Sequence, residues 1–99
     1  MENYKIQLLD RAYDDLVELI ELLSNYYPNT AVKKYDAIMD AISKLSHFPN
    51  MCEVYWKRPQ FRLLSVENYL IFYQVNESEK MVEVYRILYA KRNIAEMMG

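Results

Sequence analysis

The spacing of hydrophobic residues changes along the chain, and each period predicts a different element. At positions 4, 6 and 8, apolar side chains alternate with polar ones, which predicts a short strand with one solvent-exposed face. The next apolar residues recur every three or four positions, as they do along one face of a helix. The first such stripe consists of Ala12, Leu16, Leu19, Ile20 and Leu23, and the second of Ala31, Tyr35, Ile38, Ile42 and Leu45.

A short break at residues 26–29 separates the two predicted helices. Pro28 disfavours helical geometry in the residue before it, so the first helix should end there. Asp10 is expected to cap the first helix, and Asn29 or Thr30 the second, because short polar side chains accept the free N–H groups of a first turn. So short a link predicts an antiparallel helical hairpin.

The last third of the chain predicts three strands, at about residues 61–66, 69–76 and 81–89. Residues 50–60 have no period and contain Pro59, so they are expected to form a loop, and residues 76–80 a hairpin turn. The middle strand is apolar on both faces, which is typical of a central strand covered on both sides. After Ala90 the spacing of Ile94, Met97 and Met98 predicts a short amphipathic helix at the C-terminus.

This order of elements predicts an α+β fold in a single domain over residues 1–99. It has an N-terminal strand, an antiparallel helical hairpin packed on a twisted, mostly antiparallel sheet, and a short C-terminal helix. Ten tyrosines add large half-polar surfaces, which favour interfaces as well as the core.

Charge and cysteine content restrict the function classes. The net charge of −2 argues against nonspecific binding to nucleic acid. The charges are unevenly placed, with nine acids and five bases in residues 1–53 but five acids and seven bases in residues 54–99. Cys52 is the only cysteine, no leader is visible, and no apolar run approaches the roughly 18 residues of a membrane span, so a cytoplasmic protein without a membrane partner is expected.

The scarcity of glycine, histidine and cysteine argues against several kinds of chemistry. The only glycine is Gly99, so the chain has no glycine-rich loop to hold a nucleotide, and no cofactor is expected. His47 and Cys52 lack partners at metal-ligand spacing, so no metal site is predicted. His47 is better explained by the C-terminal end of a helix. Asp14 and Asp15 are expected to lie on the exposed helix face as solvated charges.

The remaining candidates are basic and aromatic residues near the predicted sheet. Arg62, Arg86, Lys91 and Arg92 emerge from or follow apolar strands, and Trp56-Lys57-Arg58 combines an aromatic ring with two cations on the loop. Such a set suits a phosphate, a nucleobase or a partner carboxylate. For Arg86 the alternative is a structural salt bridge, with Glu67 or with an acid from the helices.

The order of these residues resembles the RelE/ParE superfamily of bacterial toxins over some 85 residues. The resemblance depends on A-x-x-D-L-x-x-I in the first helix and on A-x-K-x-x-x-x-I-x-x-A-I-x-x-L-x-x-F-P in the second. It continues with R-x-L-x-V-x-N-Y-x-x-x-Y and R-I-L-Y-x-x-R in the strands. In this sequence the strand motifs are Arg62, Leu64, Val66, Asn68, Tyr69 and Tyr73, then Arg86, Ile87, Leu88, Tyr89 and Arg92.

The resemblance implies a toxin of a type II toxin–antitoxin pair, neutralised by an antitoxin whose flexible acidic-amphipathic segment wraps around the hairpin and the sheet. It would act as a homodimer or as part of a toxin–antitoxin hetero-oligomer. Leu16, Leu19, Ile38 and Ile42 would meet the antitoxin only where they escape the core. An attenuated toxin that survives as a binding module is a further alternative.

The superfamily has two branches with different targets. ParE-like members bind and poison DNA gyrase, whereas RelE-like members are metal-independent endoribonucleases that cleave mRNA in the ribosomal A site. Leu70 and Leu88 stand where RelE-like enzymes carry an arginine and, in some relatives, a histidine. The two long helices also fit the ParE-like branch better. A gyrase poison is therefore favoured, with an mRNA endonuclease as the alternative.

The expected roles of the site residues differ between these branches. In the ParE-like interpretation, Arg62, Arg86, Tyr89, Lys91 and Arg92 form the target-binding surface, joined by Trp56, Lys57 and Arg58. In the RNA-cleaving alternative, Tyr89 and Arg92 act on the scissile phosphate, while Lys57, Arg58 and Arg62 hold the RNA. An unperturbed tyrosine has a pKa near ~10, so Tyr89 would need a strongly cationic surrounding to act as a base.

Overall fold

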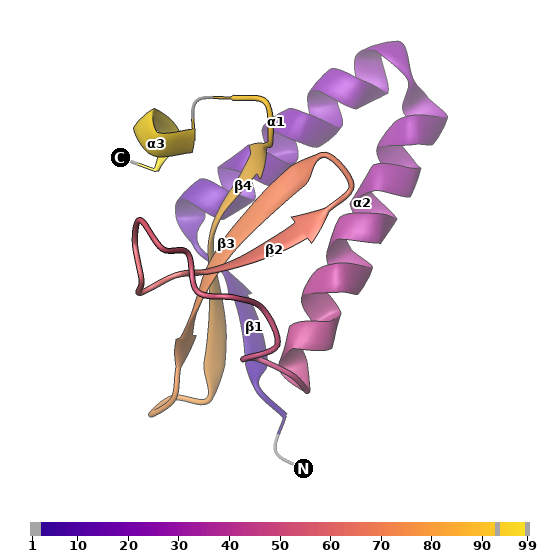
Figure 1. Ribbon diagram of the computed structural model, residues 1–99. Helices are drawn as coiled ribbons and strands as arrows, with labels where there is room; N and C mark the ends of the chain where they lie inside the picture. Colours follow the sequence, from indigo (N-terminus) through magenta and orange to yellow (C-terminus); the bar gives the residue numbers. More distant parts are fainter. Residues whose placement is uncertain (1–2, 93, 99) are drawn as a thin grey trace.

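The computed structural model describes residues 3–92 and 94–98, and its elements follow the predicted order (Figure 1). These are β1 (Lys5–Leu8), α1 (Asp10–Tyr26), α2 (Pro28–Ser43), the 3₁₀ turn η1 (Lys44–Ser46), β2 (Arg62–Val66), β3 (Tyr69–Asn76), β4 (Met81–Tyr89) and α3 (Ile94–Met97). The three strand ranges predicted in the last third of the chain are confirmed to within one residue.

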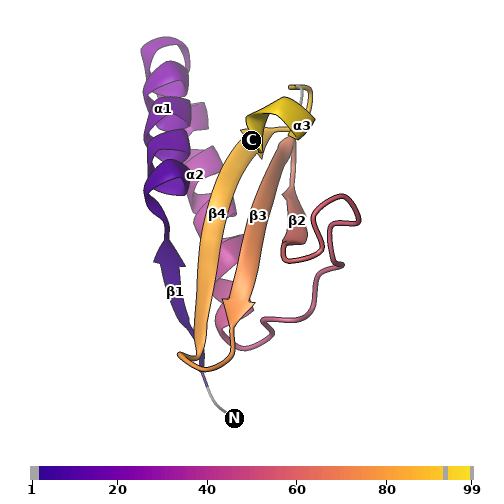
Figure 2. The ribbon, with the colours of Figure 1, turned by 90° about the vertical axis from the view of Figure 1, so that its left-hand side faces the viewer.

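The four strands form one sheet in the order β1-β4-β3-β2. β1 runs parallel to β4, whereas β3 is antiparallel to both of its neighbours. α1 and α2 form the expected hairpin, and the two helices separate with distance from the turn that joins them (Figure 1). Figure 2 shows α3 beside the ends of β3 and β4. The α+β architecture and the central place of the β3 strand are therefore confirmed.

Apolar side chains cover the sheet on both faces. The larger cluster lies between the sheet and the hairpin and includes Leu16, Ile38 and Ile42, so these three positions belong to the core as expected. A smaller cluster on the other face joins Phe72 and Leu88 to side chains from the loop and from α3. Its buried members are Phe61, Phe72, Leu88 and Met98. Two covered faces explain why β3 is apolar on both faces from Tyr69 to Tyr73.

The helix starts differ from those predicted. Asp10 is the first residue of α1, Leu9 occupies the capping position, and no side chain caps the helix. Asp10 still lies in the first turn, where its charge favours the helix dipole. α2 begins at Pro28, whose fixed φ suits a first helical position, so Asn29 and Thr30 already lie inside the helix. The predicted caps were wrong.

Tyr35 also departs from prediction, because 43% of its surface is exposed although it belongs to the apolar stripe of α2. Its side chain lies on the side of α2 that faces α1 and solvent. No helix in residues 3–92 and 94–98 combines the length and the apolar character that crossing a membrane requires.

Candidate functional site

A β-bulge in β4 marks the position of the site. Phe72 pairs with Arg86 but the next residue of β3, Tyr73, pairs with Val84, so β4 has one extra residue between them. A bulge increases the local twist and redirects nearby side chains. β1 pairs with β4 only up to Val84, so beyond that residue no strand among the described residues covers this edge of β4.

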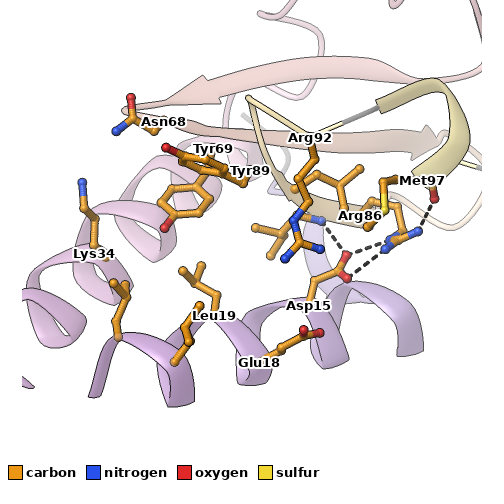
Figure 3. A pocket seen from close by; sticks show the side chains of 14 residues that line it. Asp15, Glu18, Leu19, Lys34, Asn68, Tyr69, Arg86, Tyr89, Arg92 and Met97 are labelled. Atoms are coloured by element: carbon orange, nitrogen blue, oxygen red, sulfur yellow. Dashed lines mark hydrogen bonds and ion pairs between the residues drawn. The ribbon is translucent and has the colours of Figure 1, made fainter. Parts of the chain in front are cut away.

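The carboxylate of Asp15, on α1, covers the edge of β4 where β1 ends. It accepts the backbone N–H of Ile87 at 3.0 Å, and it accepts Nε and Nη2 of Arg86 at 2.7 and 2.9 Å (Figure 3). Arg86 also donates Nη1 to the carbonyl of Met97, the last residue of α3. The hydrogen bond to Asp15 raises the pKa of Arg86, although burial opposes that shift. One ion pair thus connects α1, β4 and α3.

This arrangement decides between the two interpretations of Arg86. The arginine is 4% exposed and its donors point at internal acceptors, so the structural salt bridge with a helix acid is confirmed. Glu67, the other suggested partner, binds Lys34 instead. The expectation that Asp15 is a solvated charge was wrong, because its side chain is only 13% exposed. Arg86 therefore lies at the bottom of the site, where its guanidinium is bound to internal acceptors.

Above this ion pair lies an open groove of about 450 Å³ between α1 and the ends of β3 and β4 (Figure 3). One wall is apolar and comes from α1, and the opposite wall carries two tyrosines and an arginine. The groove is lined by Asp15, Glu18, Leu19, Leu22, Leu23, Lys34, Asn68, Tyr69, Arg86, Ile87, Leu88, Tyr89, Arg92 and Met97. We call it the Tyr89 groove.

Two phenols form the polar wall of the Tyr89 groove. Tyr69 and Tyr89 are directly opposite each other on β3 and β4, and their ring centroids are 5.7 Å apart. Burial raises the pKa of Tyr69, and the nearby Lys34 reduces that effect only partly. Tyr69 is therefore protonated at neutral pH and can donate a hydrogen bond to a ligand, but it is a poor general base.

Arg92 contributes an exposed cation to the same groove. It follows β4 in a turn held by two backbone bonds, from Ala90 N–H to Asn68 O at 2.8 Å and from Arg92 N–H to Tyr89 O at 3.0 Å. Lys91 is exposed beside it but does not line the groove. Within the described part of the chain, neither cation has an ion-pair partner. A carboxylate or phosphate could therefore bind here without displacing an internal acid.

The other predicted cations lie away from the Tyr89 groove. Arg62 donates Nη1 to the carbonyl of Cys52 at 2.6 Å, and Arg58 donates Nη1 to Met98 O at 2.7 Å while packing over the Phe61 ring. Both therefore hold the 50–60 loop in place. Trp56 is 77% exposed, and the Lys57 ammonium lies 5.2 Å from its ring centroid, so this pair forms a separate surface feature.

The structure thus brings together three of the eight predicted site residues, Arg86, Tyr89 and Arg92. It also adds residues that were not predicted for the site, chiefly Tyr69, Lys34 and the apolar wall of α1. Tyr69 could have been inferred, since the two strand motifs place it opposite Tyr89. In residues 3–92 and 94–98, no three His, Cys, Asp or Glu side chains are grouped to hold a metal ion.

Comparison with known proteins then assigns the family. The family model described as the ParE toxin of the type II toxin–antitoxin system parDE matches residues 6–94. This chain belongs to the ParE toxin family. The ParE match runs from the second residue of β1 to the first residue of α3, and so includes both walls of the Tyr89 groove. None of the curated proteins matches the sequence.

Solved structures share the fold of this ParE-family toxin at low sequence identity. One is from a chromosomal ParDE system of Pseudomonas aeruginosa, with a TM-score of 0.76 and 18% identity over 89% of this chain and 97% of that one. Another is from a RelBE2 toxin–antitoxin complex of Mycobacterium tuberculosis, with a TM-score of 0.66 and 16% identity over 88% and 98%. The RelE/ParE-like fold is therefore confirmed.

Proposed function

We propose that this ParE-family toxin stops growth by binding DNA gyrase through the Tyr89 groove and the Lys91–Arg92 turn, without cleaving RNA. The observation that best supports this is a pair of leucines. Leu70 and Leu88, at the positions where the resemblance places RelE-like catalytic residues, are cross-strand neighbours packed in the smaller apolar cluster. A leucine pair can neither transfer a proton nor stabilise a phosphorane.

The groove itself suits a protein target. Its α1 wall offers leucines to an apolar side chain, while Arg92 offers a bidentate donor to a carboxylate. Exposed aromatic and arginine side chains around an apolar depression are typical of protein–protein hot spots. The net charge of −2 disfavours the many phosphate contacts that binding to ribosomal RNA requires.

A supercoiling assay with purified gyrase tests this proposal. Wild-type toxin is expected to inhibit supercoiling, and Arg92→Glu to weaken the inhibition at least about tenfold because it replaces a donor with a repelling charge. Lys33→Glu is the matched control, since it makes the same charge change on the exposed surface of α2. Inhibition that Arg92→Glu leaves unchanged would contradict the proposed binding surface.

The endonuclease alternative is tested with purified ribosomes that carry a defined codon in the A site. We expect no mRNA cleavage by the wild-type toxin. Cleavage that Arg92→Ala abolishes would replace the gyrase proposal with the RelE-like one. The oligomeric state and the gyrase target are predictions of the family resemblance, and the cytoplasmic location is a prediction of the sequence.

A further inference from the structure

We propose that the ion pair between Lys34 and Glu67 positions the target-binding surface, because it fixes the turn between β2 and β3 against α2 and so holds the polar wall of the Tyr89 groove in place. This inference depends on the proposed binding of gyrase through that groove. It makes Lys34 and Glu67 positioning residues for the surface around Arg92.

The turn between β2 and β3 contains a backbone conformation that favours glycine. Val66 pairs with Tyr69, so Glu67 and Asn68 form a two-residue hairpin loop. Glu67 has a φ of 53°, in the left-handed region, where a side chain crowds the backbone and a glycine would not. In residues 3–92 and 94–98, the one other residue with such a φ is Lys80, at 51°. A glutamate at this position therefore costs energy that a glycine would not.

Lys34 binds the carboxylate of Glu67, and this contact ties the turn to a helix. Nζ of Lys34 donates to Oε1 of Glu67, and the two side chains are 22% and 47% exposed, so the pair is partly shielded from solvent. The Lys34 side chain lines the Tyr89 groove and extends from α2 toward the turn that carries Asn68 (Figure 3). The pair therefore connects α2 to the end of the sheet where the target-binding surface lies.

Backbone contacts extend from this turn to the target-binding surface. The carbonyl of Asn68 accepts the N–H of Ala90 at 2.8 Å, and the N–H of Arg92 donates to the carbonyl of Tyr89 at 3.0 Å. Tyr69, the first residue after the turn, lies directly opposite Tyr89 on β4. A movement of Asn68 would therefore displace both phenols and the cation of Arg92.

The combination of a strained backbone with an ion pair indicates a positioning role. A strained residue persists where surrounding contacts impose its conformation, and such residues cluster at ligand-binding sites. The contact that Glu67 gains is the pair with Lys34, which a glycine could not form. An ion pair near the surface contributes little to stability by itself. Its larger effect is to hold the phenols and Arg92 in one arrangement, which lowers the entropic cost of binding a partner.

The variant Glu67→Gly separates positioning from stability. It removes the ion pair but relieves the left-handed backbone, so the urea concentration at its unfolding midpoint should be unchanged or higher. Its affinity for gyrase should nevertheless fall at least about threefold, because the groove is less fixed. A lower midpoint together with the lower affinity would indicate a merely structural role and overturn the proposal.

Lys80→Gly is the matched control for this variant. It makes the same backbone change and removes the ion pair with Glu77, but it lies in the turn between β3 and β4, at the opposite end of β3. Its affinity for gyrase should equal that of the wild type. Equal affinities of Glu67→Gly and Lys80→Gly would overturn the proposal.

Exchanging the two charges tests whether Lys34 acts through Glu67. Lys34→Glu places two acids together and should weaken gyrase binding at least about threefold. Adding Glu67→Lys restores the pair in reverse and should recover most of the lost affinity. A cation that itself contacts the target would not be rescued in this way, because the exchange leaves an acid on α2 in the groove. Absence of rescue would overturn the proposal.

Amide hydrogen exchange on the free toxin tests the positioning role independently of the target. In Glu67→Gly, the amide of Ala90 should exchange at least about threefold faster than in the wild type, while that of the buried Ile71 is unchanged. Unchanged exchange at Ala90 would overturn the inference even where gyrase is inhibited. Failure of the wild-type toxin to inhibit gyrase would instead overturn the proposed function, and the exchange result would still show whether the pair fixes the turn.

Discussion

Asp15 satisfies three donors at the point where β1 stops covering β4. Its two oxygens accept one backbone N–H and two guanidinium N–H groups, and for the backbone N–H of Ile87 they take the place of a strand carbonyl. Because a buried guanidinium is costly without its acceptors, this carboxylate is essential for placing a cation within the sheet.

Replacing Asp15 by Ala should therefore destabilise the fold strongly. Arg86 would remain buried without its anionic partner, which typically costs about 3–5 kcal/mol in the free energy of unfolding. Urea unfolding measures the change. Asp14→Ala is the control, since its exposed neighbouring side chain should contribute little. Equal losses in the two variants would contradict the role assigned to Asp15.

Tyr73 is expected to make the free energy of unfolding fall with rising pH in the alkaline range. Its hydroxyl donates to the carbonyl of Pro49 at 2.8 Å, and burial raises its pKa above the usual value. The folded state therefore retains a proton that the unfolded state releases near pH ~10. Stability from this group is fully present below that pH and falls as the pH rises above it.

The variant Tyr73→Phe isolates this effect. It should cost about 1 kcal/mol at neutral pH through the lost hydrogen bond. Above pH ~10, its free energy of unfolding should fall less steeply than that of the wild type. Unfolding by urea across the pH range measures both slopes, and parallel slopes would show that Tyr73 does not contribute.

At the scale of elements, α3 is held by a few specific contacts. Met98, just after the helix, is 2% exposed in the smaller apolar cluster, and arginines bind the carbonyls of Met97 and Met98. Met98→Ala should lower the free energy of unfolding by about 2–5 kcal/mol. Met97→Ala removes a less buried side chain of the same kind and should cost less. The reverse order in urea unfolding would contradict this packing.

Elements with a clear period could be predicted from the sequence. β3 and β4 are mostly apolar runs rich in aromatic and β-branched residues and bounded by turns, and the helical stripes repeat over several turns, so the type and order of these elements follow from local pattern. The helix starts were missed because Pro28 and Leu9 act through backbone geometry instead of a polar side chain. The sequence could not show that Asp15, among several acids, pairs with Arg86, because this pairing depends on where β1 ends beside the bulge in β4.

The candidate site could be predicted only in part, because it too depends on how elements distant in the sequence pack together. The sequence motif identifies Tyr89 and Arg92, but the apolar wall opposite them comes from α1, more than sixty residues earlier in the chain. Nothing in the sequence distinguishes Arg58, Arg62 or Arg86 from an arginine that binds a ligand. The structure shows that each donates to internal carbonyls or to Asp15.

At the scale of the whole molecule, two grooves of different character lie on either side of α1. Arg92 is an exposed cation in the Tyr89 groove, whereas the groove between α1 and α2 that Tyr13, Val17 and Tyr35 line is flanked by the exposed acids Asp10, Asp14 and Asp36. Separate surfaces that differ in charge and polarity suit partners of different chemistry.

The measurement that most directly tests the central claim is a pulse-label of growing bacteria after controlled induction of the toxin. Thymidine and methionine incorporation are followed over the first minutes, with Arg92→Glu as the inactive control. A gyrase poison should stop thymidine incorporation first, while protein synthesis continues. An early stop in methionine incorporation with DNA synthesis intact would contradict the account and place the toxin on the ribosome.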